Sequence, residues 1–251
     1  MRNRAGTSRW VPLCRVLTAC VLVGATVACL PPATNSNSGA TVVFVGDSLA
    51  VETAQFLPTL VEPSTLVPHV FGGTAPCDWL STDLQLTADS VLVISFIGNS
   101  GSPCMADGAG GFLQGQAILD KYRTDVSVLI ETARSAEARV LLVGQPPRND
   151  SASSNEVVGG LNVIYTELAS VEGIEFVDAG ALVENPDGTF AVVLPCLPNE
   201  PLCDASGSNV VRSDDGVHLC PGASGAPLPC QVYSSGAFRF AKAIADAILR
   251  V

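Results

Sequence analysis

The residues best suited to chemistry in this sequence are a serine, a histidine and a pair of aspartates. Ser48 closely follows the apolar run 41–45, and His218 comes three residues after Asp215 and four after Asp214. A serine hydroxyl is a weak nucleophile at neutral pH unless an imidazole takes its proton and a carboxylate orients that imidazole. The sequence therefore contains the parts of a nucleophilic site, and from residue types alone either aspartate could be the orienting group.

Two histidines are available as the base, and their surroundings differ. His69 lies inside an expected strand beside Pro68, where we expect a structural role. His218 lies in a turn-rich loop that leads toward the last expected helix, from which an imidazole can reach the edge of a sheet. Activity that depends on His218 as base should fall when the pH drops and the ring takes up a proton. The alternative for Ser48 is that it only caps a helix.

Strands that alternate with helices must position these residues. Short apolar runs predict strands at 41–45, 66–71, 91–97, 139–144 and 174–177, and helical periodicity predicts helices at 50–60, 110–134, 157–171 and 234–249. This order predicts an α/β fold of three layers, α/β/α, with a five-stranded parallel sheet. Pro68 places its strand at the outside of the sheet. In such sheets chemistry occurs beyond the carboxyl ends of the strands, which is where Ser48 falls.

The charge balance narrows the choice of partners. The net charge is −11, and beyond Cys29 nine basic residues face 24 acidic ones, a balance of −15. This excess disfavours nucleic acid and anionic membrane surfaces as partners. A hydrophobic fraction of 47% with 15% charged residues indicates a globular chain with an ample core. We expect a monomer.

The N-terminal residues are typical of a targeting segment. Residues 1–29 combine early arginines with an apolar run at 16–28 and end in Cys29. They predict a signal peptide of the lipoprotein type with Cys29 as the lipidated residue, and ordinary secretion after cleavage near Ala28 is the alternative. Residues 30–40 predict a flexible tether and 41–251 the folded domain. The expected location is extracellular, with the membrane reached only through the lipid anchor.

Six cysteines remain in the folded domain. In an exported protein the oxidising environment would join them in disulfides. Fifteen pairings are possible for six cysteines. We expect Cys77–Cys104, Cys196–Cys203 and Cys220–Cys230, of which the last two are local in sequence. The irregular segment 180–229 contains three of the six, and Cys230 follows it directly. We expect this segment to be a disulfide-tied stretch that carries catalytic residues. With two histidines and no Cys-x-x-Cys pair, no metal site and no cofactor are predicted.

Four short motifs in chain order resemble those of the SGNH (GDSL) hydrolase superfamily. They are Gly46-Asp47-Ser48-Leu49, the pair Gly72-Gly73, Asn99, and Asp215-Gly216-Val217-His218. The resemblance spans roughly residues 42–251. The sequence departs from the family pattern at Ile97-Gly98-Asn99-Ser100, where the family usually has Gly-x-Asn-Asp.

The resemblance implies a flavodoxin-like sheet and an exported serine esterase or lipase that works through an acyl-enzyme. It implies Ser48 as nucleophile, His218 as base and Asp215, rather than its neighbour, as the orienting carboxylate. It also implies an oxyanion hole made by the N–H groups of Ser48 and Gly73 and the amide of Asn99, with Gly73 preferred over the preceding glycine. The substrate would be an acyl or acetyl ester of a glycan or lipid.

Two other functions fit the same residues. An O-acyltransferase acting on cell-envelope glycan would use the same serine, histidine and aspartate, with a sugar hydroxyl in place of water. A non-catalytic binding module would keep the fold without the chemistry. Analysis of the products formed with a glycan acceptor distinguishes the acyltransferase from a hydrolase. Labelling by a fluorophosphonate distinguishes an enzyme from a binding module, which should not react.

Overall fold

A computed structural model describes residues 39–222 and 229–250 of the chain. The expected signal peptide, its Cys29 and the tether up to residue 38 lie outside the described residues. Within the part of the chain that the structure describes, no helix is long and apolar enough to cross a membrane.

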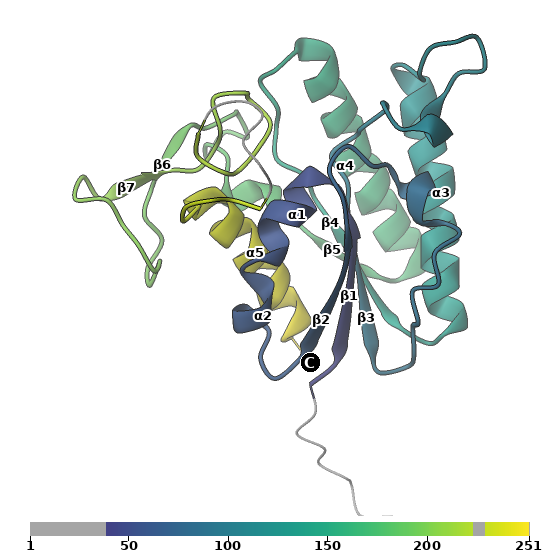
Figure 1. Cartoon of the computed structure of the whole chain (residues 1–251), viewed down its shortest axis with the longest axis horizontal. Coiled ribbons are helices and arrows are strands. Elements are labelled where there is room, and N and C mark those ends of the chain that lie inside the picture. Colours follow the sequence, from purple (N-terminus) through teal and green to yellow (C-terminus); the bar gives the residue numbers. More distant parts are fainter. Residues whose placement is uncertain (1–38, 223–228, 251) are drawn as a thin grey trace, which may run out of the picture. The chain divides into compact units, whose positions relative to one another are not determined.

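The centre of the domain is a parallel sheet of five strands (Figure 1). The strands are β1 Thr41–Gly46, β2 Thr65–Val70, β3 Ser90–Ser95, β4 Arg139–Val143 and β5 Glu175–Val177. Their spatial order is β2-β1-β3-β4-β5, the flavodoxin-like order, and every pair is parallel. The expected fold class is confirmed, including the outer position of the strand that contains Pro68.

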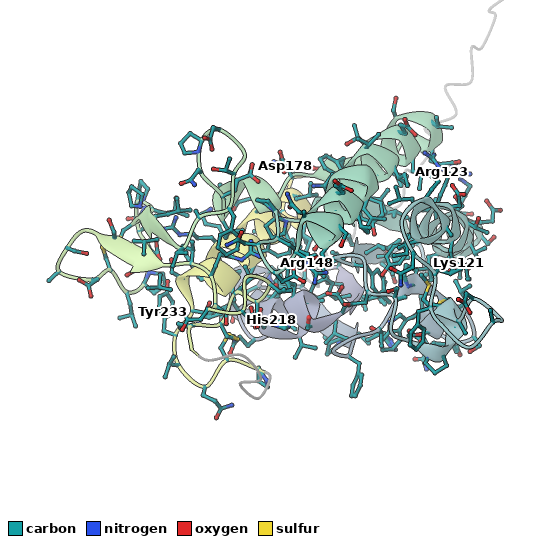
Figure 2. All side chains as sticks on the ribbon, turned by 90° about the horizontal axis from the view of Figure 1, so that it is seen from above. Lys121, Arg123, Arg148, Asp178, His218 and Tyr233 are labelled. Carbon is teal, nitrogen blue, oxygen red and sulfur yellow. A yellow bond between two sulfur atoms is a disulfide. The ribbon has the colours of Figure 1, made fainter. Side chains whose placement is uncertain are left out.

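Helices cover both faces of the sheet, and Figure 2 shows the same layers from above. The helices are α1 Ser48–Ala54, α2 Leu57–Leu60, α3 Gln116–Ser135, α4 Ala152–Glu172 and α5 Ser235–Ile248. Val42 and Phe44 of β1 pack in the core with α1 and α5, whereas Val43 and Val45 pack in the core with α3 and α4. A strand that is buried on both faces must be apolar throughout, which explains the unbroken run of β1.

Helix boundaries differ from the sequence expectation in three places. The helix expected at 50–60 is two helices: α1 ends at Ala54, and Pro58 is an early residue of α2, where its missing N–H costs nothing. Helix α3 begins at Gln116 instead of residue 110, after Gly115 at a φ of +50°. Helix α4 begins five residues earlier than expected because Ser151 caps it by accepting from Ser154 N–H at 3.1 Å.

Residues 180–222 form a lobe beside α5 with a small sheet that the sequence analysis did not predict. Strands β6 Val193–Pro195 and β7 Ser208–Val210 pair in the antiparallel direction. Three single turns of 3-10 helix, η1 Pro76–Trp79, η2 Pro103–Met105 and η3 Gly180–Leu182, complete the secondary structure of the described residues.

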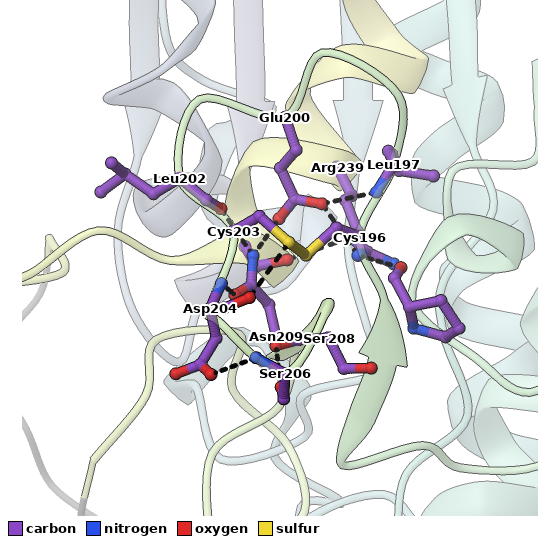
Figure 3. Close-up of a disulfide and its surroundings, with 12 residues drawn as sticks. Cys196, Leu197, Glu200, Leu202, Cys203, Asp204, Ser206, Ser208, Asn209 and Arg239 are labelled. Atoms are coloured by element: carbon purple, nitrogen blue, oxygen red, sulfur yellow. Dashed lines mark hydrogen bonds and ion pairs between the residues drawn. A yellow bond between two sulfur atoms is a disulfide. The ribbon is translucent and has the colours of Figure 1, made fainter.

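A buried ion pair attaches this lobe to α5 (Figure 3). Glu200, whose side chain is fully buried, accepts from Arg239 Nη2 of α5 at 2.9 Å and from Asn209 Nδ2 of β7 at 2.7 Å. Burial raises the pKa of Glu200, but the hydrogen bonds that it accepts and the charge of Arg239 outweigh this and leave the pKa below its usual value. The lobe is therefore held by charge-assisted hydrogen bonds next to the Cys196–Cys203 disulfide.

Three disulfides join the expected pairs: Cys77–Cys104, Cys196–Cys203 and Cys220–Cys230. Three disulfides in one domain suggest that the domain is extracytoplasmic, because thiols stay reduced in most cytosols.

Candidate active site

The start of α1 places Ser48 at the carboxyl edge of the sheet. Gly46 ends β1, and a Cβ there would lie 2.3 Å from the Cβ of Ala50 and 2.5 Å from the carbonyl oxygen of Ser95. Only glycine fits where the strand turns this tightly into the helix. Ser48 is the first residue of α1 and is buried, with 6% of its surface exposed.

Asp47, beside the serine, links the ends of two strands. Its carboxylate accepts hydrogen bonds from Leu49 N–H at 3.2 Å, Ile97 N–H at 2.7 Å and Asn99 Nδ2 at 3.0 Å. Complete burial raises the pKa of Asp47 to about 7, against the lowering effects of these backbone N–H groups and of the charges on His218 and Arg148. Asp47 therefore joins the serine to the loop after β3.

Asp215 and His218 form a hydrogen-bonded pair. His218 Nδ1 lies 2.7 Å from Asp215 Oδ2, and Asp215 Oδ1 accepts from the N–H groups of Val217 at 2.8 Å and His218 at 2.9 Å. Burial raises the pKa of Asp215, but these hydrogen bonds outweigh it, so the carboxyl pKa lies below its usual value. Asp214 is exposed, and among the described residues only Asp215 forms a hydrogen bond with the His218 ring.

Gly216 allows the loop of this pair to fold. Its φ is +76°, and a Cβ there would lie 2.8 Å from the carbonyl carbon of Asn149 and from Asp150 N. Asn149 N–H donates to the Gly216 carbonyl at 2.9 Å, which binds the loop to the segment after β4. A side chain at Gly216 would push these two segments apart.

His218 lies over the same edge of the sheet as Ser48. The charge on His218 lowers the pKa of two carboxyl groups. One belongs to Asp47, next to Ser48, and the other to Glu52, one helical turn after Ser48. Figure 2 looks onto this edge and shows His218 and Arg148 near its middle. The ring of His218 is 32% exposed, and among the described residues no hydrogen bond joins it to Ser48 Oγ. In unliganded sites such bonds are often long and tighten when substrate binds.

Two backbone donors near the serine are unused. Among the described residues neither Ser48 N–H nor Gly73 N–H donates to another group. Gly73 is exposed at a φ of +80°, with open space where a Cβ would point, so a ligand can approach its backbone closely. The following residue, Thr74, fixes this loop to β1 by donating from Oγ1 to the Gly46 carbonyl at 3.2 Å.

The side-chain amide nitrogen of Asn99 donates two hydrogen bonds. Nδ2 donates to Asp47 at 3.0 Å and to the Thr74 carbonyl at 3.2 Å. Tyr122 of α3 donates to the Asn99 carbonyl at 2.8 Å and holds its backbone. Gly98, at a φ of +96°, packs against α4, where a Cβ would lie 2.9 Å from Val157 Cγ1. The amide thus lies among the Ser48, Gly73 and β3 segments.

His69 belongs to the structural part of the protein. It lies in β2 opposite Val45, and its ring centroid is 6.0 Å from that of Trp79 in an edge-to-face arrangement. Trp79 Nε1 donates to Thr74 Oγ1 at 3.4 Å. Both aromatic rings therefore support the loop that contains Gly73.

Two buried charged residues beside the His218 loop were missed by the sequence analysis. Glu52 of α1 accepts from Leu219 N–H at 2.7 Å and Cys220 N–H at 3.2 Å. Arg212 donates to the carbonyls of Val217 at 2.7 Å and Pro147 at 2.9 Å. A signal existed for Glu52, an acidic residue four positions after Ser48 in an apolar helix. The sequence offered none for Arg212.

Two groups of residues in the described part of the chain have metal-ligand types close together. One is Glu52 with Cys220 and Cys230, and the other is Asp78 with Cys77 and Cys104. In both groups the two sulfur atoms are joined in a disulfide, so they are not thiolate ligands.

A polar cavity of about 330 Å³ borders the loop of Asn99. Gly98 and Ser100 form part of its wall. The remaining wall comes from the starts of α3 and α4 and the residues just before α3. Its polar side chains are those of Gln114, Gln116, Ser153, Ser154 and Glu156, and its apolar ones are those of Ile118, Leu119 and Val157.

Comparison with known proteins agrees with this architecture. Residues 84–226 match the family described as "Protein of unknown function (DUF459)", and the chain belongs to that family. The matched region contains Asn99, Asp215 and His218 and excludes Ser48. No curated protein matches the sequence.

Solved structures with the same fold are SGNH/GDSL hydrolases. An acetyl-xylooligosaccharide esterase from Geobacillus stearothermophilus, solved as a mutant, is 14% identical with a TM-score of 0.57, over 85% of this chain and 96% of that one. A GDSL-like lipase from Bacteroides thetaiotaomicron is 16% identical with a TM-score of 0.54, over 83% and 87%. A carbohydrate acetylesterase from Sinorhizobium meliloti is 16% identical with a TM-score of 0.52, over 83% and 98%. The chain has the SGNH hydrolase fold.

Proposed function

We propose that this protein is an exported serine esterase that hydrolyses carboxylic esters. The observation that carries the proposal is the Asp215–His218 pair at 2.7 Å, on the same edge of the sheet as the helix that begins with Ser48. A hydrogen-bonded carboxylate and imidazole beside a serine at a strand end is the arrangement that activates a hydroxyl group.

The proposed reaction has two halves. Ser48 Oγ attacks the ester carbonyl carbon while His218 Nε2 takes the hydroxyl proton, and Asp215 holds the proton on Nδ1. The tetrahedral intermediate then releases the alcohol, which receives the proton from the imidazolium. Water repeats the sequence on the acyl-enzyme, with His218 again as base, and frees the acid and Ser48.

The oxyanion of each tetrahedral intermediate would receive three hydrogen bonds. Ser48 N–H and Gly73 N–H are free to donate, which supports their assignment. Asn99 Nδ2 would exchange its 3.2 Å bond to the Thr74 carbonyl for one to the oxyanion and keep its 3.0 Å bond to Asp47. Stabilisation of this kind grows as the negative charge develops on the oxygen, so it lowers the barrier.

We assign the alcohol part of the substrate to a hydroxylated group such as a sugar. The support is the cavity beside Asn99, whose lining is more polar than apolar and offers several hydrogen-bonding side chains. Of the three structural neighbours named above, two are esterases of acetylated carbohydrates and one is a GDSL-like lipase. Acetyl esters of a hydroxylated alcohol suit this cavity better.

The experiment that tests the proposal is covalent labelling with turnover. The purified domain should react with a fluorophosphonate at Ser48, which mass spectrometry of the labelled peptide identifies, and should hydrolyse p-nitrophenyl acetate. Ser48→Ala should abolish both, whereas Ser127→Ala, at a half-buried serine on α3, should change neither. Labelling at another residue, or hydrolysis by Ser48→Ala, would contradict the assignment.

A further inference from the structure

Glu52 is a completely buried acidic residue that the proposed reaction does not use. No basic side chain forms an ion pair with it among the described residues. Its partners are two backbone N–H groups, those of Leu219 and Cys220. Burial raises the pKa of Glu52, against the lowering effects of the Leu219 N–H and of the charge on His218. For stability alone an apolar residue would serve better at a buried position of a helix.

The position of Glu52 relates it directly to the nucleophile. Ser48 and Glu52 are four residues apart in α1, so they lie on the same side of the helix, one turn apart. The N–H that Glu52 Oε2 accepts at 2.7 Å belongs to the residue immediately after His218. One helical turn and one carboxylate therefore connect Ser48 to the His218 backbone, although the two residues lie 170 positions apart in the chain.

The His218 loop is held from its other sides as well. Arg212, which is fully buried, donates to the carbonyl of Val217, the residue before the histidine. Ser213 N–H donates to the His218 carbonyl at 2.7 Å, and Ser234 Oγ, the N-cap of α5, donates to the Leu219 carbonyl at 2.6 Å. Of these contacts, only the two accepted by Glu52 come from the helix that contains Ser48.

We propose that Glu52 is a positioning residue that sets the place of the His218 imidazole relative to the Ser48 hydroxyl. The proposal rests on the esterase function given above. Each oxygen of the Glu52 carboxylate takes one N–H of the loop, so the link fixes both the distance and the tilt of the segment. A shift of about 1 Å between reacting groups can lower a rate about 10²-fold.

Two substitutions test this role. Glu52→Ala removes both acceptors and should lower kcat about 10²-fold with KM unchanged, since Glu52 does not touch substrate. Glu52→Gln keeps one acceptor oxygen but turns an N–H₂ group toward the other backbone N–H, so it should give an intermediate kcat. Melting temperatures are measured for all variants, and if Glu52→Ala does not fold, Glu52→Gln decides the question.

A spectroscopic measurement separates positioning from loss of structure. The chain has two histidines, so ¹⁵N-labelled imidazole spectra contain His218 and His69 as two sets of signals. In Glu52→Gln the His218 Nδ1–H signal should shift and exchange faster with water, while the His69 signals stay unchanged. Asp125→Asn is the matched control, because Asp125 is a buried acid on α3, far from the His218 loop in the fold, and should leave kcat and the His218 signal as they were.

The outcomes distinguish the two proposals. A native protein that does not hydrolyse esters, or that keeps its activity in Ser48→Ala, would overturn the esterase function, and the spectra would still test the link from Glu52 to His218. Native kcat in Glu52→Gln with an unchanged His218 signal would overturn the role of Glu52 alone.

Discussion

Asp47 Oδ2 accepts hydrogen bonds from both Ile97 N–H at 2.7 Å and Asn99 Nδ2 at 3.0 Å, so one carboxylate joins the residue before the nucleophile to the loop after β3. This relationship means that Ser48 and Asn99 cannot move independently. It also buries an ionisable group at the centre of the site, with consequences for the pH dependence of stability.

The first prediction concerns that pH dependence. Burial raises the pKa of Asp47 to about 7, from 3.8 in the unfolded chain. Between these values the folded protein binds more protons at this position than the unfolded chain, so the stability contribution of Asp47 is fully present below pH 3.8 and is lost as the pH rises through 7. The melting temperature of the native protein should therefore increase relative to that of Asp47→Asn when the pH falls from 8 to 5. A difference that stays constant over this range would show that Asp47 titrates normally.

The orienting role of Asp215 gives the second prediction. Asp215→Asn removes the charge that stabilises the imidazolium and favours the wrong ring tautomer, so kcat should fall by about 10²–10⁴. Asp214→Asn is the matched control, because the neighbouring carboxyl is exposed and should not affect the rate. Initial rates on p-nitrophenyl acetate measure both. Equal losses of kcat in the two variants would mean that the rate depends on the total negative charge of the loop and not on the Asp215–His218 pair.

The third prediction tests the amide of Asn99. Asn99→Ala should lower kcat about 10²–10³-fold with little change in KM, because an oxyanion donor acts mainly in the transition state. Asn185→Ala, in the lobe and bonded only to its own turn, serves as the control. The idea fails if the loss in Asn99→Ala lies wholly in KM, since this would place the amide on the ground-state substrate.

The buried ion pair of the lobe supplies the fourth prediction. Glu200→Ala leaves Arg239 buried without its carboxylate, which should destabilise the protein by about 3–5 kcal/mol. Glu167→Ala breaks the exposed pair with Arg123 and should cost about 1 kcal/mol or less. Urea denaturation followed by circular dichroism measures both free energies of unfolding. Similar values for the two variants would show that burial does not govern these pairs.

The sequence was sufficient for the layers and strands of the fold. The apolar run of β1 and the break at Gly46 are local features, and β1, β2 and β3 each end near a candidate site residue. The pairing of the cysteines was also accessible, because Cys196–Cys203 and Cys220–Cys230 are close in the chain and only one pair then remains.

The parts that the sequence did not predict depend on contacts between distant segments. Glu52 meets Leu219 across 167 positions, and Arg212 meets Pro147 across 65, and no local pattern records either contact. The small sheet of β6 and β7 has three residues in each strand, too few for a periodic signal. The roles of Ser48, Gly73 and Asn99 in catalysis stay predictions for the experiments above.

The position of β1 inside the sheet determines how much of the chain an autonomous folding unit requires. The region that matches the family, residues 84–226, contains neither β1 nor α5. A fragment limited to it would leave the edge of β3 unpaired and one face of the sheet bare, and sheets with such edges tend to aggregate. Recombinant forms of this domain must therefore extend from β1 through α5, whatever limits sequence matching suggests.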